Sequence, residues 1–305
     1  MSNRINEILN NYKHENAGVR SNIVRILNHG TLTGTGKVVI LPVDQGFEHG
    51  PIRTFGPNPS GYDPLYHVEL AIESGCNAYA APLGFIQMAA SEYPGQIPMI
   101  LKINNNDSLY KTKDPIPSIT STIEDALQLG CGAIGYTIYP GTANKKQNFE
   151  ELQQLTLAAK ENGLAVVVWS YPRGSNISKE GETGIDIASY AAQIACQMGA
   201  NIVKVKPPTE IIEQPENKKV IETKNLDIST LSKRIELVVK SAFDGKRIII
   251  FSGGAKKDDN QMLLEEIKQI HQGGGFGSIV GRNAFQRPKK EAIQLLNDIM
   301  TIYKS

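Results

Sequence analysis

The chain has 305 residues, of which 40% are hydrophobic, and its formal net charge at pH 7 is +1. This length and apolar content allow one large core, and the interspersed acidic and basic residues exclude the basic face of a nucleic-acid-binding protein. No apolar run approaches the length of a membrane span, and the N-terminal MSNRINEILNNYKHENAGVR lacks the apolar core of a secretory signal. We therefore expect a cytoplasmic protein with no membrane or nucleic-acid partner.

Taken in chain order, the pattern predicts a helical extension and then eight short apolar strands. The extension covers residues 1–36 and is expected to close the bottom of the fold. The strands are apolar on both faces, as in a covered parallel sheet. They are Lys37–Val43, Asn77–Pro82, Ile97–Ile103, Ala133–Ile138, Ala165–Trp169, Ile202–Val205, Arg247–Phe251 and Ser278–Val280.

Amphipathic helical segments separate the strands. Clear examples are Phe149–Asn162, Asp186–Met198, Thr230–Phe243 and Leu263–Gln272, each with glycine at or near its end. This alternation predicts an α/β fold, a single-domain (β/α)8 TIM barrel over residues 1–305, with a core at 37–290 and the end of a C-terminal helix at 291–305. A doubly wound open sheet is the alternative. The segments Gly50–Tyr62 and Asn104–Ser118 are expected to be long surface loops.

Cysteine and histidine spacing gives no sign of a metal or disulfide site. Cys76, Cys131 and Cys196 are isolated and are expected to be buried reduced thiols. The five histidines form no H-x-H or H-E-x-x-H pair. We therefore expect no metal and no other cofactor.

Polar or aromatic residues close most of the predicted strands. In a (β/α)8 barrel the carboxyl ends of the strands meet at one face, where the chemistry takes place. A polar cluster at so many strand ends favours an active site at this face. The clusters include Asp44, Lys102, Tyr139, Trp169, Tyr171, Arg173, Lys204, Ser252 and Arg282.

The strand at 202–205 carries the sharpest candidate for chemistry. Lys204 interrupts an apolar run, where a charged amine is costly to bury. Side chains alternate along a strand, so Lys204 and Lys206 share one face. A desolvated lysine has a lowered pKa and can attack a carbonyl as a neutral amine. The alternative is an ammonium that reaches solvent from the strand end, which suits Lys206 better. Lys102 has a similar context, and the strand pattern leaves these alternatives open.

Glycine-bearing turns follow the last two strands and predict a phosphate site. Ser252, Gly253 and Gly254 allow backbone N–H groups to approach an anion without interference from Cβ atoms. Gly281 adds a backbone donor and Arg282 a guanidinium, and barrels often bind phosphate between these strands. The alternative is that the glycines only serve tight turns.

Asp44 and Tyr171 are the acid–base candidates. A carboxylate or a phenol opposite the lysine can move protons during carbinolamine formation and C–C cleavage. The structural alternatives are a helix cap for Asp44 and a rim aromatic for Tyr171. Trp169 either walls the site or fills the barrel interior, and His49 either contacts a ligand or stabilises its own loop.

Six segments that occur in order, over roughly residues 38–290, carry a family resemblance. They are LPVDQGFEHGP, GYTIYPGT, VVVWSYPRG, ANIVKVKPP, FSGGAKK and GSIVGRNAFQRP. Together they resemble the archaeal-type class I fructose-bisphosphate aldolases, a family also found in many bacteria. The resemblance implies a (β/α)8 barrel and a Schiff-base aldehyde-lyase that needs no metal.

The resemblance also implies roles for individual residues. The Schiff-base lysine falls on Lys204, in preference to Lys102 and Lys206. The proton donor and acceptor falls on a tyrosine, for which we choose Tyr171 with Tyr139 as the alternative. The other implied site residues are Asp44, His49, Trp169, an arginine directed at a second phosphate (Arg173), a lysine after the glycine turn (Lys256), and the phosphate contacts Ser252, Gly253, Gly254, Gly281 and Arg282.

The implied reaction is the reversible cleavage of fructose 1,6-bisphosphate into dihydroxyacetone phosphate and glyceraldehyde 3-phosphate, in glycolysis and gluconeogenesis. The family often forms decamers, so a homo-oligomer is expected. The sequence departs from the family at 104–118 and 210–227, which leaves the substrate preference open. Two alternatives follow: a related Schiff-base lyase or transferase acting on another phosphorylated keto-sugar, and a sugar-phosphate-binding barrel without turnover.

Overall fold

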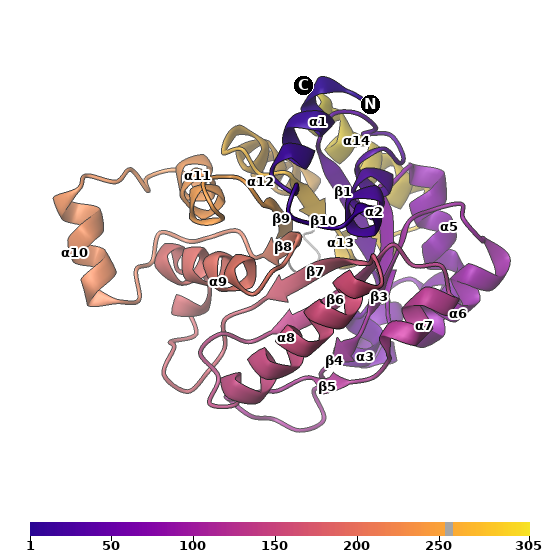
Figure 1. Ribbon diagram of the computed structural model, residues 1–305, viewed down its shortest axis with the longest axis horizontal. Helices are drawn as coiled ribbons and strands as arrows, with labels where there is room; N and C mark the ends of the chain where they lie inside the picture. Colours follow the sequence, from indigo (N-terminus) through magenta and orange to yellow (C-terminus); the bar gives the residue numbers. More distant parts are fainter. Residues whose placement is uncertain (254–258) are drawn as a thin grey trace.

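A computed structural model describes residues 1–253 and 259–305. In these residues, eight parallel strands close into a barrel in the order β1-β10-β9-β8-β7-β6-β3-β2 (Figure 1). The strands are β1 Val38–Pro42, β2 Ala78–Ala81, β3 Met99–Lys102, β6 Ala133–Ile138, β7 Ala165–Ser170, β8 Ile202–Val205, β9 Ile248–Ser252 and β10 Gly277–Ile279. All eight predicted strands are confirmed, and closure of the sheet excludes the doubly wound alternative.

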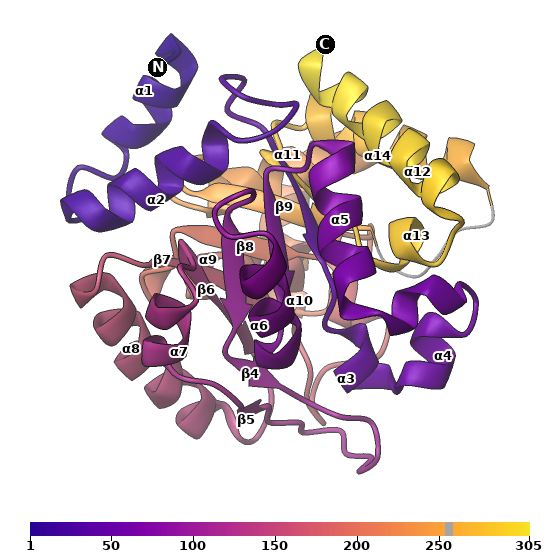
Figure 2. The same cartoon turned by 90° about the vertical axis from the view of Figure 1, so that its right-hand side faces the viewer.

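Helices surround the barrel on its outside (Figure 2). They are α1 Asn3–Asn10, α2 Ala17–Leu27, α3 Gln45–His49, α4 Pro51–Phe55, α5 Pro64–Ser74, α6 Leu83–Glu92, α7 Ile123–Gln128, α8 Lys145–Glu161, α9 Ile185–Gln197, α10 Pro215–Thr223, α11 Leu231–Ser241, α12 Asn260–Gln272, α13 Arg282–Phe285 and α14 Lys289–Lys304, with 3-10 turns η1 Pro59–Tyr62 and η2 Gly181–Thr183. The four predicted helices correspond to α8, α9, α11 and α12. Across the described part of the chain, none of these helices has the length and apolar character that crossing a membrane requires.

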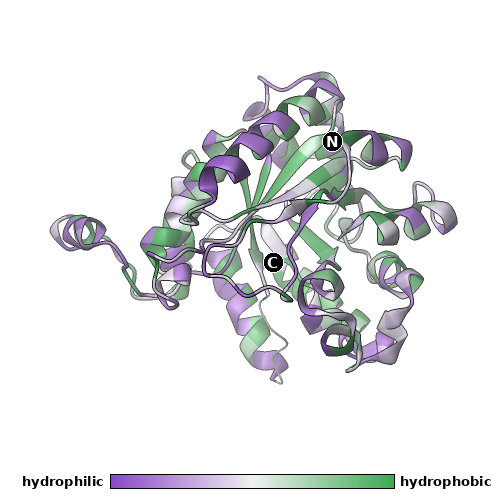
Figure 3. Cartoon of the chain, turned by 90° about the horizontal axis from the view of Figure 1, so that it is seen from below, coloured by the Kyte–Doolittle hydropathy of each residue, from purple (hydrophilic) through white to green (hydrophobic). Residues whose placement is uncertain are grey.

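Alternation along each strand divides the core into two layers. Val38 and Ile40 of β1 belong to a cluster inside the barrel, while Val39 and Leu41 pack in the layer between the barrel and the helices. Both layers are apolar, which explains why the strands carry no polar face. Figure 3 shows this arrangement as apolar strands at the centre and polar residues on the surrounding helices.

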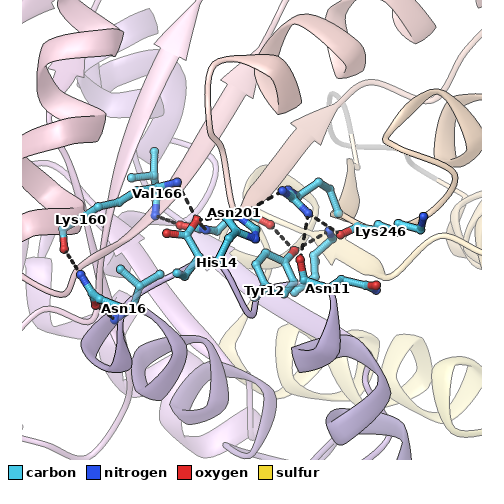
Figure 4. Close-up of polar contacts among 12 residues, drawn as sticks. Asn11, Tyr12, His14, Asn16, Lys160, Val166, Asn201 and Lys246 are labelled. Carbon is cyan, nitrogen blue, oxygen red and sulfur yellow. Dashed lines mark hydrogen bonds and ion pairs between the residues drawn. The ribbon is translucent and has the colours of Figure 1, made fainter.

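The predicted N-terminal extension closes the bottom of the barrel with α1 and α2. Eight of its apolar side chains join the interior cluster and are buried, namely Ile5, Ile8, Leu9, Tyr12, Val19, Ile23, Ile26 and Leu27. The Tyr12 hydroxyl donates to the carbonyl of Asn201 at 2.6 Å and accepts from the Ile248 N–H at 3.0 Å (Figure 4). The side chain of Asn201 in turn accepts from the Val166 N–H at 2.8 Å. The extension is therefore tied to the starts of β7, β8 and β9.

The prediction of a long loop over Gly50–Tyr62 is wrong, because this segment contains α4 and η1. Pro51 and Pro59 stand in the first turns of these elements, where proline's fixed φ favours helix. Phe55 then anchors the segment, with its ring centroid 5.3 Å from that of His67 and 6.1 Å from that of Phe285. Prolines that indicated a loop in the sequence mark helix starts in the structure.

The second predicted loop, Asn104–Ser118, is largely irregular but is pinned at both ends. Asn104–Asn105 (β4) pairs antiparallel with Ser118–Ile119 (β5). Further along, the carboxylate of Asp114 accepts from the Ala143 N–H at 2.9 Å and from the Ser175 N–H at 3.1 Å. The segment is thereby held against the loops that follow β6 and β7.

The departure at 210–227 forms an arm that projects from the barrel beside α11 (Figure 1). Its helix, α10, buries none of its residues. The predicted division between the barrel core and the C-terminal helix, at residues 290 and 291, falls within α14, and the domain boundaries stay a prediction.

Candidate active site

A cavity of about 1100 Å³ opens at the carboxyl ends of the strands. It lies at the end of the barrel where a (β/α)8 fold carries its chemistry. Gly254 and Lys256 lie outside the described residues. The other predicted residues that line the cavity are Asp44, His49, Tyr171, Arg173, Lys204, Ser252, Gly253, Gly281 and Arg282.

Lys204 lies on the cavity wall with its side chain almost fully buried, at 4% exposure. Its backbone neighbours are Trp169 of β7 and Ile250 of β9. Burial lowers the pKa of Lys204 to about 8, although the nearby carboxylates of Asp44 and Glu48 oppose the shift. About a tenth of an amine with this pKa is neutral at pH 7, so Lys204 can act as a nucleophile without a large change of state.

The two competing lysines have different surroundings. The Lys102 ammonium is buried and donates to the Asn104 carbonyl at 2.6 Å, and it does not line the cavity. Lys206 lines the cavity on the same strand face as Lys204, as the alternation predicts. Burial and the neighbouring Arg173 lower the pKa of Lys206 to about 8. Geometry therefore leaves two amines in the cavity, with Lys204 the deeper of the two.

Asp44 and Tyr171 line the cavity together with this lysine, and they follow β1 and β7. Asp44 is at the N-cap position of α3, but its carboxylate makes no capping hydrogen bond and points to the cavity instead. The Tyr171 ring centroid is 5.3 Å from the Nζ of Lys204. Burial and the carboxylates of Asp44 and Glu48 raise the pKa of Tyr171 well above its usual value, while a hydrogen bond with Ser252 opposes the shift. Both side chains are thus available for proton transfer.

Trp169 lies beneath Lys204 rather than on the cavity wall. It is 1% exposed, belongs to the interior cluster, and its ring centroid is 5.2 Å from the Lys204 Nζ. Of the two interpretations of Trp169, filling the interior describes its position. Gly135 of β6 makes room for the indole, because a Cβ there would lie 2.5 Å from the Trp169 Cζ3.

One end of the cavity is lined by cations and by the turns after β9 and β10. Arg282 and His49 lie here with Arg53, which sequence reasoning did not identify. Burial and the two arginines lower the pKa of His49, so its imidazole is neutral near pH 7. The Gly253 N–H donates to the Ile279 carbonyl at 3.3 Å, so this predicted phosphate donor is already engaged. Side-chain cations therefore dominate this end.

The opposite end carries a second group of cations. The guanidinium of Arg173 and the ammonium of Lys179 contact the same carboxylate, Glu182, at 2.7 and 2.9 Å. Lys206 lies beside them. Three cations with one carboxylate leave a net positive charge, which favours an anion at this end as well.

Glu48 was not predicted as a site residue, although it lies within the same motif as Asp44 and His49. It lines the cavity from α3. The signal in the sequence is its spacing, since residues four apart on a helix point the same way and Asp44 precedes the helix by one residue. The short α3 was itself hidden, because its five residues give no helical periodicity.

Comparisons with known proteins agree with this geometry. The family model described as DeoC/LacD family aldolase matches residues 38–287. A probable fructose-bisphosphate aldolase class 1 of Chlamydia muridarum is 36% identical over 298 residues, covering 94% of this chain and 85% of the relative. A fructose-bisphosphate aldolase class 1 of Thermoproteus tenax is 35% identical, covering 83% of this chain and 84% of the relative. A solved structure of an archaeal fructose-1,6-bisphosphate aldolase has its catalytic lysine covalently bound to the carbinolamine intermediate of the substrate. It superposes with a TM-score of 0.77 at 31% identity, covering 92% of this chain and 98% of the other.

Proposed function

Because this chain belongs to the DeoC/LacD family of aldolases, we propose that it is a class I fructose-bisphosphate aldolase, an aldehyde-lyase that acts through a lysine Schiff base. The observation that carries the proposal is the buried Lys204 amine, which lies in a cavity with cations at both ends. A keto-sugar with a phosphate at each end fits this arrangement. One phosphate is held by Arg282, His49 and Arg53, and the other by Arg173 and Lys206.

The first step is capture of the carbonyl. The neutral Lys204 amine attacks C2 of the open-chain sugar, and the resulting carbinolamine loses water to give an iminium. The iminium draws electrons from the C3–C4 bond. The lowered pKa of Lys204, about 8, supports this role because it supplies neutral amine near pH 7.

The second step is C–C cleavage. Tyr171 takes the proton of the C4 hydroxyl as the C3–C4 bond breaks, while its own phenolic proton passes to the Asp44 carboxylate. Glyceraldehyde 3-phosphate leaves. The enamine is protonated at C3 and hydrolysed to dihydroxyacetone phosphate, which regenerates the Lys204 amine. The short separation between the Tyr171 ring and the Lys204 Nζ supports this assignment.

Borohydride trapping tests the mechanism. We expect reduction in the presence of fructose 1,6-bisphosphate to leave a covalent adduct that peptide mass mapping locates on Lys204. An adduct on Lys206 or Lys102, or no adduct, would contradict the assignment. Cleavage should continue in the presence of EDTA, and its loss on chelation would instead indicate a metal-dependent aldolase.

Substrate preference is tested by parallel assays of fructose 1,6-bisphosphate and fructose 1-phosphate. The two cationic ends support preference for the bisphosphate, so kcat/KM for the monophosphate should be lower. Equal values would favour a lyase or transferase that acts on other phosphorylated keto-sugars. Binding without trapping would favour a barrel that has lost turnover.

We also infer that the protein acts in the cytoplasm, in glycolysis and gluconeogenesis, as a homo-oligomer. Three free, buried cysteines support a reducing compartment. Light scattering coupled to size exclusion tests the assembly, and a monomeric mass would contradict it.

A further inference from the structure

Glu48 is a carboxylic acid on the cavity wall that the mechanism above does not use. It lies in α3, four residues after Asp44, and its N–H donates to the Asp44 carbonyl at 3.1 Å. This spacing directs both side chains to the same side of the helical turn, and both line the cavity. Within residues 1–253 and 259–305, the Glu48 carboxylate makes no hydrogen bond or ion pair that would explain its presence.

The charged and titratable groups that interact electrostatically with Glu48 come from several strands around the barrel mouth. Asp44 adjoins it at the end of β1, the lysines lie in β3 and β8, the arginine begins α13, and the two phenols follow β6 and β7. These neighbours are Asp44, Lys102, Tyr139, Tyr171, Lys204 and Arg282. Glu48 thus belongs to one electrostatic cluster with the nucleophile and both candidate tyrosines.

The balance of this cluster decides the protonation state of Glu48. Burial is the largest influence and raises the pKa of Glu48, and the charge of the neighbouring Asp44 raises it further. The lysines and Arg282 oppose this shift, and the resulting pKa of Glu48 is about 7. Two carboxyl groups in one site share a proton in this way. A group with a pKa near the operating pH is an efficient general acid and base, since it can both give and recover a proton.

We propose that Glu48 is a further catalytic residue, the general acid that expels water from the carbinolamine on Lys204 and the general base that later returns water to the iminium. The inference rests on the proposed Schiff-base function. It separates two proton transfers: Glu48 acts at the C2 oxygen, and Tyr171 acts at the C4 oxygen.

Attack of the neutral Lys204 nitrogen on C2 and transfer of one proton from nitrogen to oxygen give a neutral carbinolamine. The carboxylic acid of Glu48 gives its proton to the C2 hydroxyl, the C–O bond breaks, and water leaves an iminium cation and a Glu48 carboxylate. After cleavage, this carboxylate takes a proton from the water that attacks C2. The acid form is then restored for the next turnover.

The pH dependence gives a specific signature. Lys204 and Glu48 interact, so they titrate as a pair with pKa values of about 7 and about 8. Between these two pH values the pair holds one proton. The state with a neutral amine and an acidic carboxyl has this one-proton composition. We therefore expect the rate of Schiff-base formation in the natural protein to rise and then fall across this interval.

The test measures the rate of adduct formation by rapid mixing with fructose 1,6-bisphosphate and borohydride quench over a pH series. In Glu48→Gln we expect the rate to fall by about 100-fold, and the alkaline fall to disappear, leaving one rising limb. This limb should lie at the same or a higher pH than the natural acid limb, because the natural limb also includes loss of the Glu48 proton, whereas Lys204 titrates alone in Glu48→Gln. The surface variant Glu92→Gln removes a carboxylate of equal charge from the exposed end of α6 and should behave like the natural protein.

Each outcome decides the inference. Adduct formation at the natural rate in Glu48→Gln overturns it, as does a slower rate that keeps the alkaline fall. Should Glu48→Gln not fold, Glu48→Asp decides, since the retained carboxyl must preserve a bell shape whose limbs move with its new pKa. Limbs that stay unchanged in Glu48→Asp overturn the inference. An absence of any adduct in the natural protein would instead refute the proposed function.

Discussion

At the scale of single residues, the protonation state of Tyr171 depends both on its buried position and on the charges beside it. Burial and the adjacent carboxylates hold its pKa well above the usual value, so the free enzyme keeps the phenol protonated. The iminium on Lys204 adds a positive charge close to the Tyr171 ring, which stabilises the phenolate. In the proposed mechanism, Tyr171 then takes the C4 proton while its own phenolic proton passes to the Asp44 carboxylate.

Replacement of Tyr171 by Phe should separate cleavage from carbonyl capture. We expect the cleavage rate to fall by about 10²–10⁴-fold, the usual contribution of general acid–base catalysis, while borohydride trapping of Lys204 persists. The same substitution at Tyr139, which also lines the cavity, identifies the proton donor. The residue whose loss stops cleavage but not trapping has that role, and equal loss of both activities in Tyr171→Phe would indicate a structural role.

Gly135 shows a constraint that the sequence does not reveal. The glycine belongs to a family-like motif, but its function becomes clear only where the Trp169 indole fills the space of the missing Cβ. In Gly135→Ala the indole must shift, and with it the floor beneath Lys204. We expect a loss of about 1–3 kcal/mol in the free energy of unfolding, from overpacking, and a slower rate of adduct formation.

Urea titration and trapping rates measure the two effects. Gly84→Ala is the matched control, because a Cβ at Gly84 has no neighbour within 4 Å and the residue lies in α6, where alanine is favoured. If the stability of Gly135→Ala is unchanged, Trp169 can move without an energetic cost, and the indole does not serve as a fixed support beneath Lys204.

At the scale of elements, one hydroxyl between α1 and α2 makes a buried polar contact between the N-terminal extension and the barrel. Tyr12 satisfies a strand carbonyl and a strand N–H at once, in a fully buried position. In Tyr12→Phe both backbone groups lose their partner, which should cost about 1–3 kcal/mol of unfolding free energy. The catalytic face lies at the opposite end of the strands, so kcat should not change.

Chemical denaturation and a standard cleavage assay test this prediction. Tyr62→Phe is the control, since Tyr62 is 49% exposed and its hydroxyl makes no hydrogen bond within the described residues. A Tyr12→Phe variant as stable as the Tyr62→Phe variant would indicate that water replaces the hydroxyl.

The elements differ in how well their sequence predicts them, for physical reasons. The strands were predictable because a doubly covered parallel sheet requires apolar residues on both faces, and few other structures do. The helices α3 and α4 were not, because five residues carry no periodicity and their stability comes from the packing of Phe55 against distant aromatic rings. Residues on these helices, Glu48 and Arg53, were missed for the same reason.

At the scale of the whole molecule, barrel closure explains why the residues at the predicted strand ends identified much of the candidate active site. All strands run in parallel, so residues that end them meet at one rim even when far apart in sequence. Closure does not determine which lysine points into the cavity. Lys102 and Lys204 have similar local sequences, and the hydrogen bond of Lys102 to the Asn104 carbonyl distinguishes them only in the folded chain.

The same closure makes the N-terminal helices indispensable, because the lower opening of the barrel exposes an apolar interior. Deletion of residues 1–28 removes their buried side chains from this interior, namely Ile5, Ile8, Leu9, Tyr12, Val19, Ile23, Ile26 and Leu27. Each such side chain contributes about 1.5–3 kcal/mol when buried. Their combined loss is therefore as large as, or larger than, the ~5–15 kcal/mol that stabilises a typical domain. We expect the shortened chain to be insoluble or to lack a cooperative unfolding transition by circular dichroism. Replacement of α10, which buries none of its residues, by a glycine–serine linker is the contrasting change and should leave the barrel folded. A cooperative transition in the shortened chain would mean that the strands alone hold the barrel closed.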